Sequence, residues 1–434
     1  MRCQPASGGD DARTVASRWR GWARVLAQHI QHAHKVLSAN WSSSDATWTV
    51  TTDHKGETQQ FRCNFLMMCS GYYNYDTPYT PDFKGLDTFK GMVIHPQHWP
   101  KDLDYTNKKV VVIGSGATAM TLVPAMADDA ASVTMLQRSP TYVVARPDQD
   151  KIANTLRKLL PDSMAYALTR FKNTQLQHFM YQRMRKEPTK MKKALVGMVS
   201  DALGPDYDVK KHFTPKYNPW DQRLCLIPNG DLFKSIKKGK TQVITDQIDT
   251  FTANGITLTS GDTLEADIII TATGLNMQVM GGSTFAVDGR SVNFADTVSY
   301  KGMMYAEIPN LIQTFGYINA SWTLRADLTA EYACRVINHM DKLGARQCTP
   351  RLRAEDADME LRPWIEDFSA GYMQRTMNLM PRQGDRDPWR NTQNYALDKK
   401  MIRNAPLEDG ALLFAELELK PIEARLPEES QNAA

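Results

Sequence analysis

The sequence predicts an α/β fold that contains two Rossmann-like domains, and two observations support this class. The first is a glycine-rich loop at residues 114–119, which directly follows a strand-like run at 108–113. A glycine loop between a strand and a helix is typical of dinucleotide-binding domains. The second is a pair of segments, 36–71 and 243–274, that share one plan: short strands separated by turns, then a strand that stops at a small-residue turn. This plan is typical of the back half of such a domain.

Composition bounds the class of protein. A chain of 434 residues is long enough for two or three domains, and 42% hydrophobic with 23% charged residues is typical of a globular protein. The net charge of +4 is too small to indicate a nucleic-acid partner. The six cysteines show no metal-ligand spacing, and no apolar run reaches the ~18 residues of a spanning helix. We therefore predict a cytoplasmic protein without a metal site.

The two repeated segments differ in what precedes them. The second is preceded by Gly114, which lies 129 residues before Val243 and opens a complete front half. The first is preceded only by Gly8, Gly9 and Gly21, and none of these follows a strand. We therefore expect the first domain to be N-terminally truncated.

A basic helical insertion is expected within the second domain. Residues 151–200 carry eleven Lys or Arg against Asp162 and Glu187, and helices should break near Pro161 and Pro188. Apolar residues recur there at helical spacing: Leu156, Leu159, Leu160, Met164, Leu168 and Phe171. The first interpretation is a solvated basic face over a core stripe. The alternative is an amphipathic helix that rests on anionic lipid or on a partner protein.

The C-terminal third mixes one long helix with polar sequence. Residues 321–343 predict a helix that begins near Ser321 or Thr323. From Arg346 onward polar residues and prolines dominate, so we expect a loosely packed extension there, with a disordered tail after Glu428.

The glycine loop supplies the candidate nucleotide site. Gly114 would make the tight turn, Gly116 would let the backbone approach a pyrophosphate, and Ala119 would let helix and strand pack closely. Amides at the helix start would point at the anion. The candidate binding residues of this loop are Gly114, Ser115, Gly116, Ala117, Thr118 and Ala119.

The next strand indicates which nucleotide binds. Residues 132–136 end at Gln137-Arg138-Ser139-Pro140, with no acidic residue to accept from a ribose 2′-hydroxyl. Arg138 can instead form a fork onto a 2′-phosphate, with Ser139 donating beside it. We therefore predict NADPH rather than NADH.

A family fingerprint precedes the glycine loop. Residues 89–100 fit F-x-G-x-x-x-H-x-x-x-W-[PD] through Phe89, Gly91, His95 and Trp99. With the glycine loop that follows, the chain resembles flavin-containing, NADPH-dependent Baeyer–Villiger monooxygenases, and within them the bacterial enzymes that activate ethionamide. The resemblance covers about residues 36–394. It is also carried by residues 71–75, 137–140, 217–225, 272–275, 316–317 and 321–323.

The resemblance implies a fold, cofactors and an activity. It implies two glutathione-reductase-like domains, FAD reduced by NADPH, and C4a-peroxyflavin chemistry on a ketone, a sulfide or a thioamide. A homo-oligomer is compatible with it. The expected segments are an atypical 1–28, an FAD-domain remnant at 29–100 and 275–345, an NADPH domain at 101–150 and 206–274, a helical insertion at 151–205 and a C-terminal extension at 346–434.

The resemblance also implies roles for particular residues. Arg223, in the stretch 217–225, would place a fixed cation near flavin and nicotinamide. His95 would be a hinge and orienting residue on a connection between the domains. Thr273 and Gly274 would end the NADPH domain beside the cofactor.

One departure from the family leaves alternatives open. The glycine loop that holds the FAD pyrophosphate is missing from this sequence, so the FAD site is expected to be incomplete. A working monooxygenase is the first hypothesis. A truncated, inactive NADPH-binding relic and an NADPH reductase that serves free flavin are the alternatives.

Overall fold

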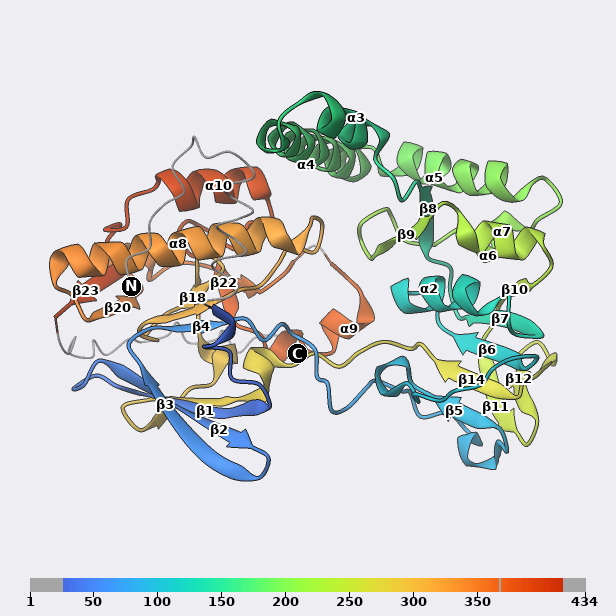
Figure 1. The fold of residues 1–434 in the computed structure, drawn as a ribbon, viewed down its shortest axis with the longest axis horizontal. Helices are drawn as coiled ribbons and strands as arrows, with labels where there is room; N and C mark the ends of the chain where they lie inside the picture. Colours follow the sequence, from blue (N-terminus) through green and yellow to red (C-terminus); the bar gives the residue numbers. More distant parts are fainter. Residues whose placement is uncertain (1–25, 367, 417–434) are drawn as a thin grey trace. The chain divides into compact units, whose positions relative to one another are not determined.

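The computed structural model describes residues 26–366 and 368–416 (Figure 1). The chain divides into two compact units. Unit 1 comprises Met1–Tyr73, Met277–Asp367 and Met373–Ala434, and unit 2 comprises Asn74–Asn276 and Phe368–Tyr372. Each unit combines helices with sheets, as the predicted α/β class requires.

Unit 2 is built on a five-stranded parallel sheet with the order β10-β7-β6-β14-β5. Its strands are β5 (Met92–Ile94), β6 (Lys109–Ile113), β7 (Ser132–Gln137), β10 (Thr241–Thr245) and β14 (Ile268–Thr271). The strands β6 and β14 are nearly continuous runs of Val and Ile, which suits strands that are covered on both faces. Val110, Val112 and Ile269 are accordingly at most 1% exposed.

The two faces of this sheet have different covers. On one face Val110, Val112 and Ile270 pack with α2 (Ala117–Met126). On the other face Val111 and Ile269 pack with an antiparallel meander. That meander is β11 (Ile248–Thr252), β12 (Gly255–Leu258) and β13 (Thr263–Glu265). The repeated segment 243–274 therefore contains a meander, but its first and last strands, β10 and β14, belong to the parallel sheet.

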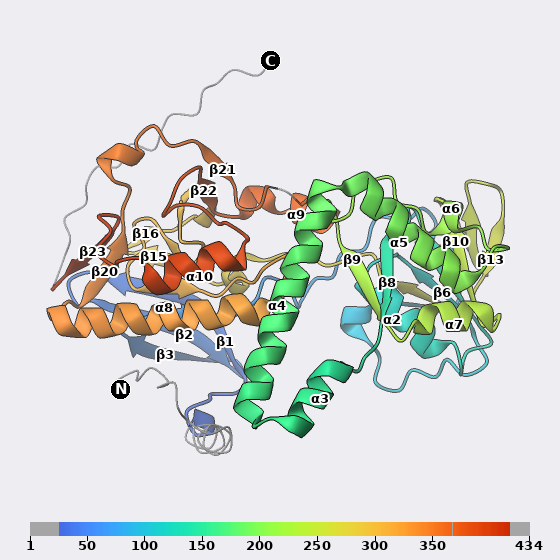
Figure 2. The same ribbon diagram turned by 90° about the horizontal axis from the view of Figure 1, so that it is seen from above.

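The segment between β7 and β10 is mainly helical (Figure 2). It contains β8 (Tyr142–Arg146), α3 (Lys151–Leu159), α4 (Asp162–Lys186), α5 (Pro188–Leu203), α6 (Val209–His212), β9 (Leu224–Pro228) and α7 (Asp231–Lys237). The helices break at Pro161 and Pro188, as the sequence predicted. The expected core stripe is wrong, because Leu159 is 74% exposed and Phe171 is 65% exposed.

Unit 1 contains a second sheet, with the order β16-β15-β1-β2-β3. The strands β1 (His34–Ser42), β2 (Thr47–His54) and β3 (Glu57–Cys63) form an antiparallel meander in the segment 36–71, in which the sequence pattern indicated β1 and β2 but not β3. The strands β15 (Thr284–Val287) and β16 (Arg290–Ser291) extend it, with β15 parallel to β1. Separately, β4 (Leu66–Met68) pairs in parallel with β19 (Leu311–Gln313).

The C-terminal part of unit 1 is well packed. The predicted long helix is α8 (Trp322–Leu343), and it packs with α10 (Tyr395–Asn404). The expectation of a loosely packed extension is wrong for residues 346–366 and 368–416, because Trp364 and Trp389 are at most 1% exposed, and the tail after Glu428 lies outside the described residues. Trp389 packs in the core with α8, and Trp364 packs against Tyr305 and Phe315, although polar residues and prolines dominate the sequence around both.

The shorter elements complete the described chain. They are η1 (Leu86–Thr88), η2 (Pro96–His98), η3 (Val279–Gly282), η4 (Phe294–Asp296), β17 (Ser299–Tyr300), β18 (Met304–Tyr305), β20 (Gln347–Pro350), η5 (Ala354–Asp356), β21 (Leu361–Pro363), α9 (Gly371–Gln374), η6 (Met377–Leu379), β22 (Arg382–Gly384) and β23 (Leu412–Ala415). Within residues 26–366 and 368–416, no helix is both long and apolar enough to cross a membrane.

Candidate functional site

The carboxyl edge of the unit 2 sheet gathers most of the predicted site residues. Gly114 follows β6, Arg138 follows β7, Thr273 and Gly274 follow β14, and His95 follows β5. All these strands are parallel and adjacent, so their carboxyl ends meet at one edge. Ligands of open α/β sheets bind at this edge.

The two glycines of the loop have different physical roles. Gly114 has a φ of 137°, and a Cβ there would lie 2.3 Å from the carbonyl oxygen of Ala272. The fold itself therefore requires glycine at position 114. A Cβ on Gly116 would meet no atom within 4 Å, so this position faces open space in front of the first turn of α2. Open space beside helix-start amides fits a dinucleotide pyrophosphate.

The loop is tied to the chain that follows β7. The Ser115 hydroxyl bonds to the Ser139 carbonyl oxygen at 3.1 Å and to the Thr141 hydroxyl at 2.9 Å. Arg138 and Ser139 are exposed at this point, next to the glycine loop. The pattern analysis missed Thr141, because its contact with Ser115 depends on how the two loops meet.

The end of β7 is fixed by Gln137, the residue that precedes Arg138. The Gln137 side chain is 1% exposed and donates to the His212 carbonyl oxygen at 2.7 Å and to the Thr245 hydroxyl at 2.9 Å. The ring of His212 also contacts that hydroxyl, at 2.9 Å. Gln137 thus anchors the strand end, while the next residue keeps its guanidinium in solvent.

His95 connects two parts of the same edge through both ring nitrogens. Its Nε2 lies 3.1 Å from the Gly274 carbonyl oxygen, and its Nδ1 accepts from the Gln97 amide at 3.2 Å. This pattern fits the neutral ring with the proton on Nε2. Burial lowers the pKa of His95 below its ordinary value, which favours the same neutral form. The ring orients the loop after β5 and has no nitrogen left for proton transfer.

The other fingerprint residues hold β5 against the sheet. Phe89 is buried with the meander residue Phe251, and Trp99 packs against the core on the α2 face. A Cβ on Gly91 would lie 2.4 Å from the carbonyl oxygen of Asp267. We expected this stretch to be a connecting loop, but residues 92–94 are the edge strand of the sheet.

Thr273 has a comparable structural contact. Its hydroxyl donates to the Tyr79 carbonyl oxygen at 2.7 Å. The threonine thereby fixes the chain just before Gly274, whose φ is 116°.

Arg223 lies immediately before β9, and two aromatic side chains hold its guanidinium. Its Nη2 donates to the Tyr372 hydroxyl at 3.0 Å, and its Cζ lies 5.7 Å from the centre of the Phe368 ring. The backbone of the same short segment is also docked, since the Ser369 amide donates to the Asp221 carbonyl oxygen at 2.8 Å. The sequence analysis missed this clamp of residues 368–372, because its Tyr372 lies 149 positions along the chain from Arg223.

The loop that carries Arg223 is held from its other side by α4. Arg185 pairs with Asp221 at 2.7 Å, and the Trp220 indole nitrogen contacts the Met184 sulfur at 3.1 Å. The loop therefore has a fixed course on both sides of the arginine.

Unit 1 contains a candidate ligand position of its own. Ser70 follows β4, and its buried hydroxyl has no hydrogen-bond partner in the described part of the chain. Gly71 comes next with a φ of 70°. Near the end of the paired strand β19, Phe315 packs against Trp322 at the start of α8, with ring centres 5.4 Å apart. A buried hydroxyl without a hydrogen-bond partner fits a polar ligand group.

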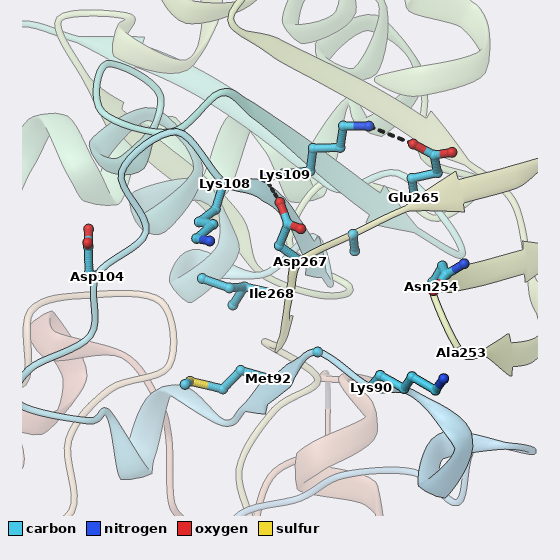
Figure 3. A pocket seen from close by; sticks show the side chains of 12 residues that line it. Lys90, Met92, Asp104, Lys108, Lys109, Ala253, Asn254, Glu265, Asp267 and Ile268 are labelled. Carbon is cyan, nitrogen blue, oxygen red and sulfur yellow. Dashed lines mark hydrogen bonds and ion pairs between the residues drawn. The ribbon is translucent and has the colours of Figure 1, made fainter.

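A surface hollow of about 620 Å³ lies at the opposite edge of the unit 2 sheet (Figure 3). It is lined by Lys90, Gly91, Met92, Asp104, Lys108, Lys109, Ala253, Asn254, Glu265, Ala266, Asp267 and Ile268. Its charges compensate one another, since Lys109 pairs with Glu265 at 2.6 Å and its amide donates to Asp267 at 2.7 Å. Its position at the amino ends of β6 and β14 separates it from the glycine loop.

The fold and the carboxyl-edge site define a dinucleotide-binding protein of the α/β class. A family model for flavin-binding monooxygenase-like proteins matches residues 20–205. The FAD-containing monooxygenase EthA of Mycobacterium tuberculosis is 52% identical over 391 residues, which cover 90% of this chain and 79% of EthA. The probable FAD-binding monooxygenase AlmA of Acinetobacter baylyi is 45% identical over 90% of this chain and 78% of AlmA.

The fold of solved structures agrees with these relatives. A steroid monooxygenase bound to NADP superposes with a TM-score of 0.70 over 95% of this chain and 87% of that chain, at 18% identity. The chain belongs to the flavin-binding monooxygenase family, and it is an enzyme of that family. The alternative of an inactive NADPH-binding relic finds no support among these relatives.

Proposed function

We propose that this enzyme uses FAD, NADPH and molecular oxygen to insert one oxygen atom into small ketones, sulfides or thioamides. Baeyer–Villiger oxidation and S-oxygenation are the two reactions concerned. The observation that carries the proposal is the carboxyl edge of the unit 2 sheet, where open space at Gly116, an exposed Arg138 and an oriented His95 lie together.

NADPH is assigned to unit 2. The amides after Gly116 would hold the pyrophosphate, and Ser115 would fix the loop through its contact with Thr141. Arg138 would bind the 2′-phosphate with Ser139 beside it. Thr273 and Gly274 would border the nicotinamide end of the site.

FAD is assigned to unit 1, where the Ser70 hydroxyl has no hydrogen-bond partner among the described residues and the Ser321 side chain does not cap the first turn of α8. When bound, NADPH supplies a hydride and the flavin supplies the site of oxygen activation. The residues of the chain position the two cofactors and supply a fixed charge beside them. Arg223 provides a fixed positive charge whose direction is set by Phe368 and Tyr372.

The proposal is tested with the purified enzyme, NADPH, FAD and two probes, cyclohexanone and thioanisole. We expect NADPH oxidation that depends on oxygen, and products heavier by one atom of ¹⁸O when the gas is ¹⁸O₂. If NADPH is consumed without labelled lactone or sulfoxide at any FAD concentration, the protein is a reductase and the proposed oxygenation is wrong.

The role of the clamp has a matched test. Tyr372→Phe removes the hydroxyl that Arg223 contacts but keeps the ring. Tyr166→Phe is the control, because its hydroxyl accepts from the surface residue Arg170 at 3.1 Å in the same kind of pair. We expect only Tyr372→Phe to lower the amount of product per NADPH consumed. Equal product yields in the two variants would exclude a positioning role for Tyr372.

A further inference from the structure

The neighbouring helices α3 and α4 both expose large apolar side chains, and on α4 four of them form a stripe along one side. Figure 2 shows the two helices side by side in unit 2. On α4 four exposed apolar residues share one side of the helix, and they are Met164 (52% exposed), Leu168 (46%), Phe171 (65%) and Phe179 (55%), whereas Tyr166 (64%) and Leu176 (43%) are exposed on other sides. On α3, Ile152 and Leu159 are 58% and 74% exposed. From Met164 to Phe179 the stripe extends over roughly 22 Å of helix.

The charge of this region is opposite in sign to that of the other residues. Residues 151–200 hold eleven basic and two acidic residues, a net charge of +9, whereas the whole chain has +4. All other residues together therefore carry −5. Part of the positive charge is paired, as in Lys172 with Asp150 at 2.6 Å. Lys151, Arg157, Lys158 and Lys186 lie exposed on the same two helices as the stripe.

We propose that α3 and α4 form a surface that docks the enzyme on an anionic lipid bilayer. Exposed apolar side chains with basic neighbours are what an interfacial helix needs: the apolar residues enter the acyl boundary and the cations meet the headgroups. The charge division orients the enzyme, because the acidic remainder is repelled by the same surface.

The same charge argues against a second copy of the chain as the occupant. Two copies that met through this stripe would bring two regions of +9 together. Like charges at a contact destabilise it. An anionic membrane is favoured over the chain itself, because it supplies both the apolar layer and the opposite charge.

The test is flotation of the full chain with lipid vesicles. Vesicles of phosphatidylcholine with about 30% phosphatidylglycerol are compared with pure phosphatidylcholine, in 0.1 M and 0.5 M NaCl. We expect binding to the anionic vesicles at low salt, and much weaker binding to neutral vesicles or at high salt, since salt screens exposed charges. No binding, or binding that ignores both lipid charge and salt, would overturn the proposal.

Two double variants and one control variant test whether α3 and α4 form the surface that binds the vesicles. The double variant Leu159→Gln and Phe171→Gln should reduce partitioning at least tenfold, because both apolar anchors are lost. The double variant Arg157→Gln and Lys158→Gln should also reduce partitioning onto the vesicles, by about fivefold for each of the two charges removed. Leu397→Gln on α10 is the control, since Leu397 is 51% exposed outside this surface. Equal losses in the control would show that the stripe has no special role.

A second measurement covers variants that fail to fold and separates the other occupants. Phe171→Trp should gain fluorescence quenching by brominated lipids, whereas Leu397→Trp should not. If the stripe variants instead change the oligomeric state in size-exclusion chromatography and leave flotation unchanged, the stripe is a self-association surface and the membrane proposal fails.

Discussion

Replacing Gly116 with valine should abolish NADPH binding and leave unit 2 folded. A Cβ at this position meets no protein atom within 4 Å, and the backbone φ of −80° with ψ of −178° is extended and suits a β-branched residue. We therefore expect a change in the free energy of unfolding within about 1 kcal/mol. The added side chain occupies the open space that a pyrophosphate would need.

The loss of binding follows from the amide contacts. A pyrophosphate held by two amides at the helix start receives charge-assisted hydrogen bonds of about 1.5–3 kcal/mol each. Losing both costs about 3–6 kcal/mol, which is roughly a hundredfold to ten-thousandfold in affinity.

Gly114→Ala is the companion variant with the opposite expectation. Its Cβ would lie 2.3 Å from the Ala272 carbonyl oxygen, and its φ of 137° is strained for any side chain. Backbone strain of about 1–3 kcal/mol and overpacking of about 1–3 kcal/mol together predict a destabilisation of about 2–6 kcal/mol.

Urea unfolding and NADPH titration by calorimetry measure the two quantities separately. The reasoning is refuted if Gly116→Val is folded and binds NADPH like the native chain, or if Gly114→Ala is as stable as the native chain.

Three further predictions concern charged and titrating groups. Arg138→Gln should reduce the preference for NADPH over NADH at least about tenfold, as measured by titration with both nucleotides, because a charge-assisted contact is lost. Asp398→Asn leaves Arg325 buried without its carboxylate partner and should cost about 3–5 kcal/mol in urea unfolding; a smaller change than ~1 kcal/mol would show that the pair is not isolated from water. The pKa of His95 is lowered in the folded state, so its contribution to stability is complete above the unfolded value of 6.5 and is lost as the pH falls through the lower folded value. The melting temperature of His95→Asn should therefore fall less than that of the native chain between about pH 7 and pH 5, and parallel curves would contradict this.

Local patterns predicted the strand before the glycine loop and the helix after it. The run of Val and Ile before Gly114 fixes a buried strand, and the glycine loop after it fixes the start of α2, so these elements lie where the sequence placed them. Pro161 and Pro188 ended helices because proline lacks the amide that a helix interior needs. Each of these signals acts over a few residues.

Non-local contacts escaped the same reasoning. The contact of Arg223 with Tyr372 joins residues that are far apart in sequence, and the sequence around neither residue predicts that it contacts the other. The burial of Trp364 and Trp389 in a polar, proline-rich stretch has the same cause, because Trp389 packs in the core with α8 and Trp364 packs against Tyr305 and Phe315, all from distant segments. The stripe on α4 shows a further limit, since helical spacing reveals an apolar face but does not reveal what covers it.

The discontinuous strand pairing of unit 1 has a consequence for how the chain is made. Strand β4 at Leu66–Met68 pairs with β19 at Leu311–Gln313, and β1 pairs with β15. The ribosome therefore synthesises β1 and β4 long before the strands with which they pair. At about 5–20 residues per second, synthesis of the intervening chain takes on the order of ten to fifty seconds. During that time the sheet of unit 2 can close, because all its strands lie within residues 92–271. The early strands of unit 1 meanwhile present unpaired edges on the ribosome, where chaperones act, so the yield of the enzyme depends on protecting this segment during translation.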